Sequence, residues 1–337
     1  MANVIRILLF YPIHILAALA LKIRHGLYDL GWIPSAEASV PLICIGNLEL
    51  GGSGKTPMAD YLLERFSGRY KIAFLSRGYG RESRGFRWLQ DCRGPEDSGD
   101  EPWFLFRKWG AQTVFAVDEN RLRGILNILE SYPETDVILL DDAFQHRRIR
   151  PSFSFLLTPF KRPFFRNFLF PCGTLRDLPT AAHRASAFIF TKAMQASEAQ
   201  LRLASESLEK AGFSGKPVFV SSVEYLSPVN HKDELPPVDC PLIAVSGLAD
   251  NQPFFDYCAS EFRISRRISL PDHYAFPPDF FIRRKIRPDA AVLCTEKDFA
   301  KILAVAPEPD LVFYLPLRIR IFPETEFIKI IEKQLAP

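Results

Sequence analysis

A glycine-rich hexapeptide lies between an apolar run at residues 42–45 and a helix-like segment at 57–66. Glycines in such a loop let backbone N–H groups approach phosphate oxygens, and the following helix adds its dipole. The first glycine of the usual pattern is replaced by Glu49. Lys55 would reach the β- and γ-phosphates, and Thr56 would ligate Mg²⁺. The order of strand, loop and helix predicts a nucleotide-binding loop made of Gly51, Gly52, Ser53, Gly54, Lys55 and Thr56.

Two adjacent carboxylates, Asp141 and Asp142, end a second apolar run at residues 137–140. In proteins with a phosphate loop, an acid at the end of a hydrophobic strand holds the magnesium ion. A third run ends in Thr191-Lys192-Ala193-Met194, where GTP-binding proteins commonly carry an Asp at the last position to read guanine. We therefore expect Mg²⁺ at the aspartate pair, and ATP rather than GTP as the nucleotide.

Apolar runs alternate with helix-length segments along most of the chain. The expected strands are residues 42–45, 72–75, 113–117, 137–140, 153–157, 187–190, 218–223, 242–245, 291–294 and 312–315. This alternation predicts an α/β fold, a P-loop NTPase-like and mostly parallel sheet with helices on both faces. A proline- and charge-rich stretch at 227–241 predicts a linker between a P-loop domain at 29–226 and a smaller α/β domain at 242–337.

The first 28 residues form an apolar segment of their own. Between residues 7 and 21 only Tyr11 and His14 are polar, and Lys22 and Arg24 follow. The run is shorter than the roughly 20 residues that span a bilayer. It also lacks the small-residue cleavage site of a secretory signal. We expect a retained membrane-anchor helix that dips into the bilayer or just crosses it, and a buried N-terminal helix is the alternative.

Composition excludes several classes of protein. The 337 residues are 47% hydrophobic and 24% charged, as in globular proteins, and the net charge of +3 is too small to indicate nucleic acid. The six cysteines contain no Cys-x-x-Cys pair, so neither a zinc site nor a disulfide scaffold is expected. Residues 160–170 interleave phenylalanines with three cations. This segment is either a second membrane contact or a partly buried loop beside the site.

Several short segments together resemble the tetraacyldisaccharide 4'-kinases, which phosphorylate the lipid A precursor at the inner membrane of Gram-negative bacteria. The matching segments are residues 45–57, 75–80, 99–102, 141–146, 170–177, 272–274 and 295–298. They occur in the order of the family. Ala143 replaces a usual glycine, and residues 172–177 read Cys-Gly-Thr-Leu-Arg-Asp where Ala-Gly-Pro-Leu-Arg-Glu is typical. The carboxylate of Asp177 is thus one methylene shorter.

The resemblance implies ATP-dependent phosphorylation of the 4'-hydroxyl of tetraacyldisaccharide 1-phosphate, giving lipid IV-A, on the cytoplasmic face of the inner membrane. It implies Asp100 as the base and His273 as its partner, in a dyad that would form on domain closure. Lipid substrate and membrane surface are the expected partners, without nucleic acid or an obligate protein partner. The expected metal ligands are Thr56, Asp141, Asp142 and Asp177. The expected substrate-binding residues are Arg77, Gln145, His146 and Arg176.

A membrane-associated P-loop ATPase that acts as a nucleotide switch for a protein partner is the alternative function. A switch needs no sugar-binding cleft and no pair of acid–base residues. The segments around Asp100 and His273 therefore favour the kinase.

Overall fold

The computed structural model describes residues 2–237, 240–272 and 274–335, with the backbone alone for residues 2–9. The chain divides into one unit of Met1–Val223 with Ile319–Pro337, and a second unit of Glu224–Arg318. Sequence patterns instead predict one C-terminal unit from residue 242 to 337. The last strand and helix return to the first unit because alternate residues of that strand, Ile319 and Ile321, are buried in its core.

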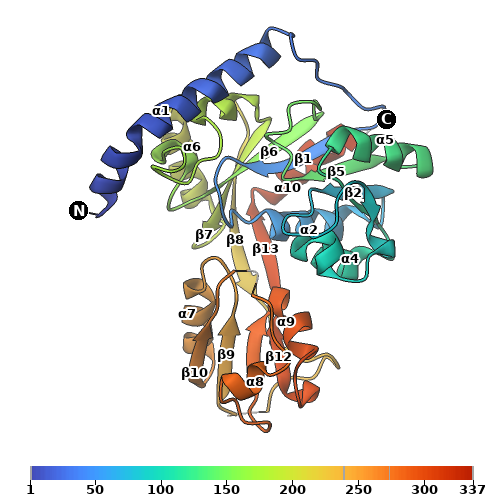
Figure 1. Cartoon of the computed structure of the whole chain (residues 1–337), viewed down its shortest axis with the longest axis vertical. Coiled ribbons are helices and arrows are strands. Elements are labelled where there is room, and N and C mark those ends of the chain that lie inside the picture. The colour runs from blue at the N-terminus through green and yellow to red at the C-terminus, as the bar shows by residue number, and fades with distance from the viewer. Residues whose placement is uncertain (1, 238–239, 273, 336–337) are drawn as a thin grey trace. The chain divides into compact units, whose positions relative to one another are not determined.

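The first unit is built on a nine-stranded sheet (Figure 1), with strand order β13-β8-β7-β6-β1-β5-β2-β4-β3. The central pairs from β4 to β8 are parallel, as predicted, and the short β3 pairs antiparallel with β4. The strands are β1 (Leu42–Asn47), β2 (Ile72–Ser76), β3 (Arg87–Trp88), β4 (Val114–Val117), β5 (Val137–Asp141), β6 (Phe153–Pro159), β7 (Ala187–Ala193), β8 (Val218–Tyr225) and β13 (Leu317–Phe322).

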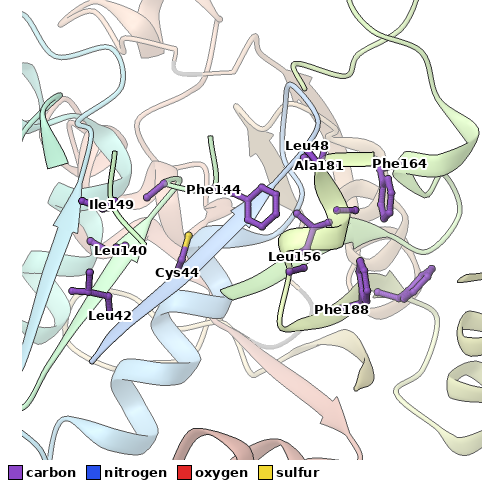
Figure 2. Close-up of a cluster of buried hydrophobic side chains, with 14 of the residues drawn as sticks. Leu42, Cys44, Leu48, Leu140, Phe144, Ile149, Leu156, Phe164, Ala181 and Phe188 are labelled. Atoms are coloured by element: carbon purple, nitrogen blue, oxygen red, sulfur yellow. The ribbon is translucent and has the colours of Figure 1, made fainter. Parts of the chain in front are cut away.

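Helices cover both faces of this sheet, because strands buried on both faces need apolar partners on each side. One buried cluster takes side chains from α5 and α6, and the other from α2, α4 and α10. Figure 2 shows part of the first cluster, in which Leu42, Cys44, Leu140 and Phe144 lie together. The helices are α1 (Ala2–Asp29), α2 (Lys55–Phe66), α3 (Pro95–Ser98), α4 (Asp100–Trp109), α5 (Arg121–Ser131), α6 (Glu198–Lys210) and α10 (Glu324–Leu335). Three short 3₁₀ turns span Leu89–Asp91, Phe164–Arg166 and Pro179–Arg184.

Helix α1 contains Pro12 and packs on the first unit by its C-terminal half. Ala18 and Leu21 contact the buried cluster, whereas the opposite side keeps large apolar residues half exposed. Among the described residues, no helix has both the length and the apolarity to cross a bilayer. The expectation of a membrane-associated helix stays a prediction, carried by the exposed side chains of Ile13, Ile15, Leu16, Leu19 and Ile23.

The second unit is a four-stranded parallel sheet of order β10-β9-β11-β12. Two buried clusters lie on its two faces. Its strands are β9 (Leu242–Ser246), β10 (Ile264–Ser269), β11 (Val292–Thr295) and β12 (Val312–Leu315), and its helices are α7 (Gln252–Glu261), α8 (Phe280–Arg283) and α9 (Glu296–Leu303). A 3₁₀ turn spans Pro309–Leu311. Predicted strands at 242–245, 291–294 and 312–315 match three of these.

Candidate active site

The glycine-rich loop joins the end of β1 to the first residue of α2, which is Lys55. Gly51 and Gly54 have φ angles of 99° and 86°, a left-handed backbone that glycine adopts without a Cβ penalty. The hydroxyl of Thr191, in β7, donates to the carbonyl of Ser53 over 2.8 Å. The loop therefore has a fixed shape at the N-terminus of a helix, where backbone N–H groups are available to an anion.

Lys55 and Arg176 both face Asp142, just beyond the end of β5. The Lys55 Nζ lies 3.6 Å from Asp142 Oδ1 and 3.4 Å from the side-chain oxygen of Asn47. Arg176 donates to both carboxylate oxygens of Asp142, with Nη1 2.7 Å from Oδ2. Burial raises the pKa of Asp142, but the hydrogen bond from Arg176 and the charge of Lys55 outweigh it and lower this pKa to about 2. Asp142 is thus a stable anion between two cations.

Asp141 differs from Asp142, because its pKa is raised and not lowered. Its Oδ2 accepts a hydrogen bond from Ser76 over 3.0 Å, but its buried Oδ1 has no partner among the described residues. Burial, followed by the charges of Glu101 and Asp142, raises the pKa of Asp141 to about 7. A buried carboxylate oxygen without a donor needs an explanation, and a cation supplies one.

The donor set at the end of β5 fits Mg²⁺. This ion takes one or two carboxylates from a protein and completes its shell with water and phosphate oxygens. Within the described parts of the chain there is no cluster of three or more His, Cys, Asp or Glu side chains that would hold a metal ion without a substrate. Asp141, Asp142 and the hydroxyl of Thr56 are the groups that would hold it here.

Asp177 does not join this group. Its carboxylate is fully buried, and His25 of α1 donates from Nε2 to Oδ1 over 2.6 Å. The backbone N–H of Leu178 and the guanidinium of Arg184 donate to it as well, at 2.8 and 3.3 Å. Burial raises the pKa of Asp177, but the His25 hydrogen bond and charge lower it overall. The expected metal ligand is therefore a link between α1 and the site, because its oxygens are already occupied.

Of the expected substrate-binding residues, Gln145 donates to a backbone carbonyl within the site, and Arg176 donates to Asp142. The side-chain amide of Gln145 donates to the backbone carbonyl of Asn47 over 2.7 Å, and the backbone carbonyl of Gln145 accepts from Arg24 over 2.9 Å. His146 has a buried ring nitrogen without a partner among the described atoms. Burial, together with neighbouring arginines that include Arg77, lowers the pKa of His146 to about 4. The ring is neutral at pH 7 in a positively charged surrounding.

Arg121 is a residue that the sequence did not single out. It is 2% exposed and donates to the backbone carbonyls of Asp118, Asp141 and Asp142 at 2.9, 3.1 and 3.4 Å. Desolvation lowers the pKa of Arg121 overall, although the charge of Asp141 opposes this effect. It fixes the turn after β5, where Asp142 has a left-handed φ of 49°. An arginine at a helix start gives no sequence signal of burial.

Asp100 opens α4, and its neighbour Glu101 is the charge that acts most strongly on Asp141. The first turn of α4 therefore lies on the side of the aspartate pair. Gly99 has a φ of 92°, and a Cβ there would stand 2.9 Å from the carbonyl of Tyr79. This close approach fixes the start of the helix. His273 lies outside the described residues.

Comparison with known proteins gives this geometry its context. A sequence model of the family described as tetraacyldisaccharide-1-P 4'-kinase matches residues 6–336. The chain belongs to the tetraacyldisaccharide 4'-kinase family.

Relatives in this family align over nearly the whole chain. A tetraacyldisaccharide 4'-kinase of Cytophaga hutchinsonii is 31% identical, with 95% of this chain and 93% of that one covered. One of Flavobacterium johnsoniae is 33% identical, with 94% and 93% covered. The solved "apo" form of LpxK from Aquifex aeolicus, in complex with ATP, superposes with a TM-score of 0.78, 27% identity and full coverage of both chains. The predicted α/β fold is confirmed, and the chain is a kinase by family.

In this kinase the aromatic segment at 160–170 divides into two parts. Phe164 is buried at 1% exposure and contacts Phe188 and Phe213 in the core, so the interpretation as a partly buried loop holds for it. Phe168 and Phe170 are each 55% exposed. The ring of Phe168 also meets His14 of α1, which brings the two apolar surfaces of the unit together.

Proposed function

We propose that this chain transfers the γ-phosphate of ATP to the 4'-hydroxyl of tetraacyldisaccharide 1-phosphate, giving lipid IV-A. The observation that carries the proposal is the meeting of Lys55 with Asp141 and Asp142 at the carboxyl edge of a parallel sheet, in a member of this kinase family. Phosphoryl transfer needs positioned phosphates and neutralised charge more than covalent chemistry. The loop and the aspartate pair supply groups suited to both.

The nucleotide rearranges the ion pairs at the aspartates. Lys55 would leave Asp142 for the β- and γ-phosphates, since a phosphate group carries the greater charge. Mg²⁺, held by Thr56, Asp141 and Asp142, would neutralise charge on the transferred group. Arg176 keeps Asp142 ionised throughout, and Arg77 is a candidate for a substrate phosphate.

Asp100 is the proposed base, with His273 as its partner. A carboxylate near an imidazole can take the proton of an alcohol close to neutral pH. The position of Asp100 in the first turn of α4, next to the residue that acts on Asp141, supports this role. Asp100→Asn should lower turnover about 10²–10⁴-fold while the Kd for ATP stays unchanged. Asp91→Asn, an exposed control, should leave both values unchanged, and normal turnover of the first variant would contradict the role.

We place the enzyme at the cytoplasmic face of the inner membrane of a Gram-negative bacterium, where ATP and the acylated substrate meet. The exposed apolar side of α1 and the rings of Phe168 and Phe170 suit insertion into the lipid interface. The double variant Phe168→Ser and Phe170→Ser should bind anionic liposomes several-fold more weakly. Leu126→Ser, an exposed leucine of α5, is the matched control. Equal binding by all three proteins would contradict the membrane contact.

The kinase reaction has a direct test. Purified protein receives Mg-ATP labelled at the γ-phosphate, with and without tetraacyldisaccharide 1-phosphate. Label is expected in the lipid. Hydrolysis of ATP without labelled lipid would contradict the kinase and favour the nucleotide switch.

A further inference from the structure

The end of β7 leaves the regular strand geometry at Lys192. The pairing of β7 with β8 shifts between Phe190 and Ala193, and Lys192 has a left-handed φ of 58°. A non-glycine residue with this backbone is strained, and such residues gather at functional sites. Irregular strand positions also re-aim side chains. The strained backbone of Lys192 itself therefore sets the direction of its side chain.

The side chain of Lys192 points at the phosphate loop. Its Nζ lies 3.9 Å from the position that a Cβ on Gly52 would occupy. The preceding residue, Thr191, fastens the same loop through its hydrogen bond to the carbonyl of Ser53. Its side chain also stands 3.6 Å from the Cβ position of Gly54. Thr191 thus fixes the loop, and Lys192 places its ammonium group next to it.

The charge of Lys192 has a local task because the loop begins with an acid. Glu49 is only 3% exposed, in the place of the usual first glycine. Burial raises the pKa of Glu49 overall, although a hydrogen bond from Asn167 and the charges of Arg162 and Lys192 oppose this rise. A carboxylate here opposes an incoming polyphosphate. A cation beside Gly52 offsets that repulsion at the residue where the phosphates arrive.

We propose that Lys192 is a second nucleotide-binding lysine of this kinase, which contacts the phosphates of bound ATP beside Gly52. The inference rests on the proposed function for the identity of the nucleotide. Lys55 and Lys192 then act together, one from the helix start and one from the end of β7.

Nucleotides with different numbers of phosphates test the proposal in the absence of lipid. Competition with a fluorescent ATP analogue gives the Kd of adenosine, ADP and ATP for wild type and for Lys192→Met, which keeps an unbranched side chain, one atom shorter, but removes the charge. The ATP affinity should fall about 10- to 100-fold, as for the loss of a charged hydrogen bond. The ADP affinity should fall less, and the adenosine affinity should be unchanged.

Two further variants control for folding and for charge. Lys192→Arg should keep most of the ATP affinity, and Lys329→Met, an exposed lysine of α10, should bind as wild type. All variants should unfold at the wild-type Tm. Unchanged ATP affinity in Lys192→Met, or an equal loss for adenosine and ATP, would overturn the proposal. A wild type that binds ATP but never labels the lipid would instead contradict the proposed function alone.

Discussion

Asp141 in the first unit and Asp298 in the second are both buried acids beside the carboxyl end of a parallel strand. Asp298 is 1% exposed and accepts hydrogen bonds from the backbone N–H of Gly247 and from the hydroxyl of Thr295, each over 2.7 Å. Its own N–H bonds to Thr295, which caps α9. Both of these donors are neutral groups of the protein itself, and both bind Oδ2.

The surroundings of Asp141 differ in kind. One of its oxygens has no donor among the described residues, and two further acids, Glu101 and Asp142, act on it. A structural acid is satisfied by the protein alone, whereas Asp141 lacks a partner that only a ligand supplies. Position at the end of a strand therefore does not distinguish a functional carboxylate from a structural one, whereas a buried oxygen without a hydrogen-bond donor does.

Loss of the Asp141 charge should have the largest effect. Asp141→Asn should lower lipid phosphorylation about 10²–10³-fold, the usual cost of removing a group that stabilises transition-state charge. Initial rates at saturating Mg-ATP measure it. Asp298→Asn is the matched control and should keep turnover within a few-fold of wild type. Equal losses in the two variants would remove the distinction between the two acids.

Loss of the Asp298 side chain should act on stability. Asp298→Ala leaves the buried N–H of Gly247 and the hydroxyl of Thr295 without an acceptor, which costs about 1–3 kcal/mol of unfolding free energy. Urea unfolding followed by circular dichroism measures the change. A variant as stable as wild type would show that water replaces the carboxylate, and that this acid is not structural.

The pH dependence of stability should separate the two acids by a smaller amount. Because the pKa of Asp141 is about 7 in the folded chain and 3.8 ordinarily, the folded state keeps a proton that the unfolded state loses between these values. The free energy of unfolding therefore falls as pH rises from about 4 to about 7.

Asp141→Asn removes this contribution, so the variant should gain stability over wild type on the order of 2–3 kcal/mol between pH 5 and 8. Urea unfolding at both pH values, with EDTA and without nucleotide, measures the difference. Subtracting the two proteins cancels the opposite contribution of His146, whose pKa is lowered to about 4. A constant difference at the two pH values would contradict the raised pKa.

Local pattern was sufficient for most of the parallel strands, the glycine-rich loop and the aspartate pair, because each is encoded within about ten residues, but it missed β10. It failed for Asp177, whose partner His25 stands 152 positions away in the sequence. Local pattern also failed to assign residues 317–322 to the first unit, because the alternation of a strand does not determine which sheet the strand joins. Phe164 and Phe168 look alike in sequence, and only packing makes one a core residue and the other a surface residue.

The neighbouring residues Arg176 and Asp177 have a practical consequence for anyone who shortens this protein. Removing the apolar helix α1 to ease purification would also remove His25, and with it one of the donors that balance a fully buried carboxylate. Leaving a buried acceptor without its donor typically costs about 1–3 kcal/mol, and more at a charged group. Asp177 directly follows Arg176, which donates a hydrogen bond to Asp142, so the loss of His25 would disturb the candidate site as well. A truncated enzyme that loses activity would therefore say nothing about membranes until its site is known to be intact.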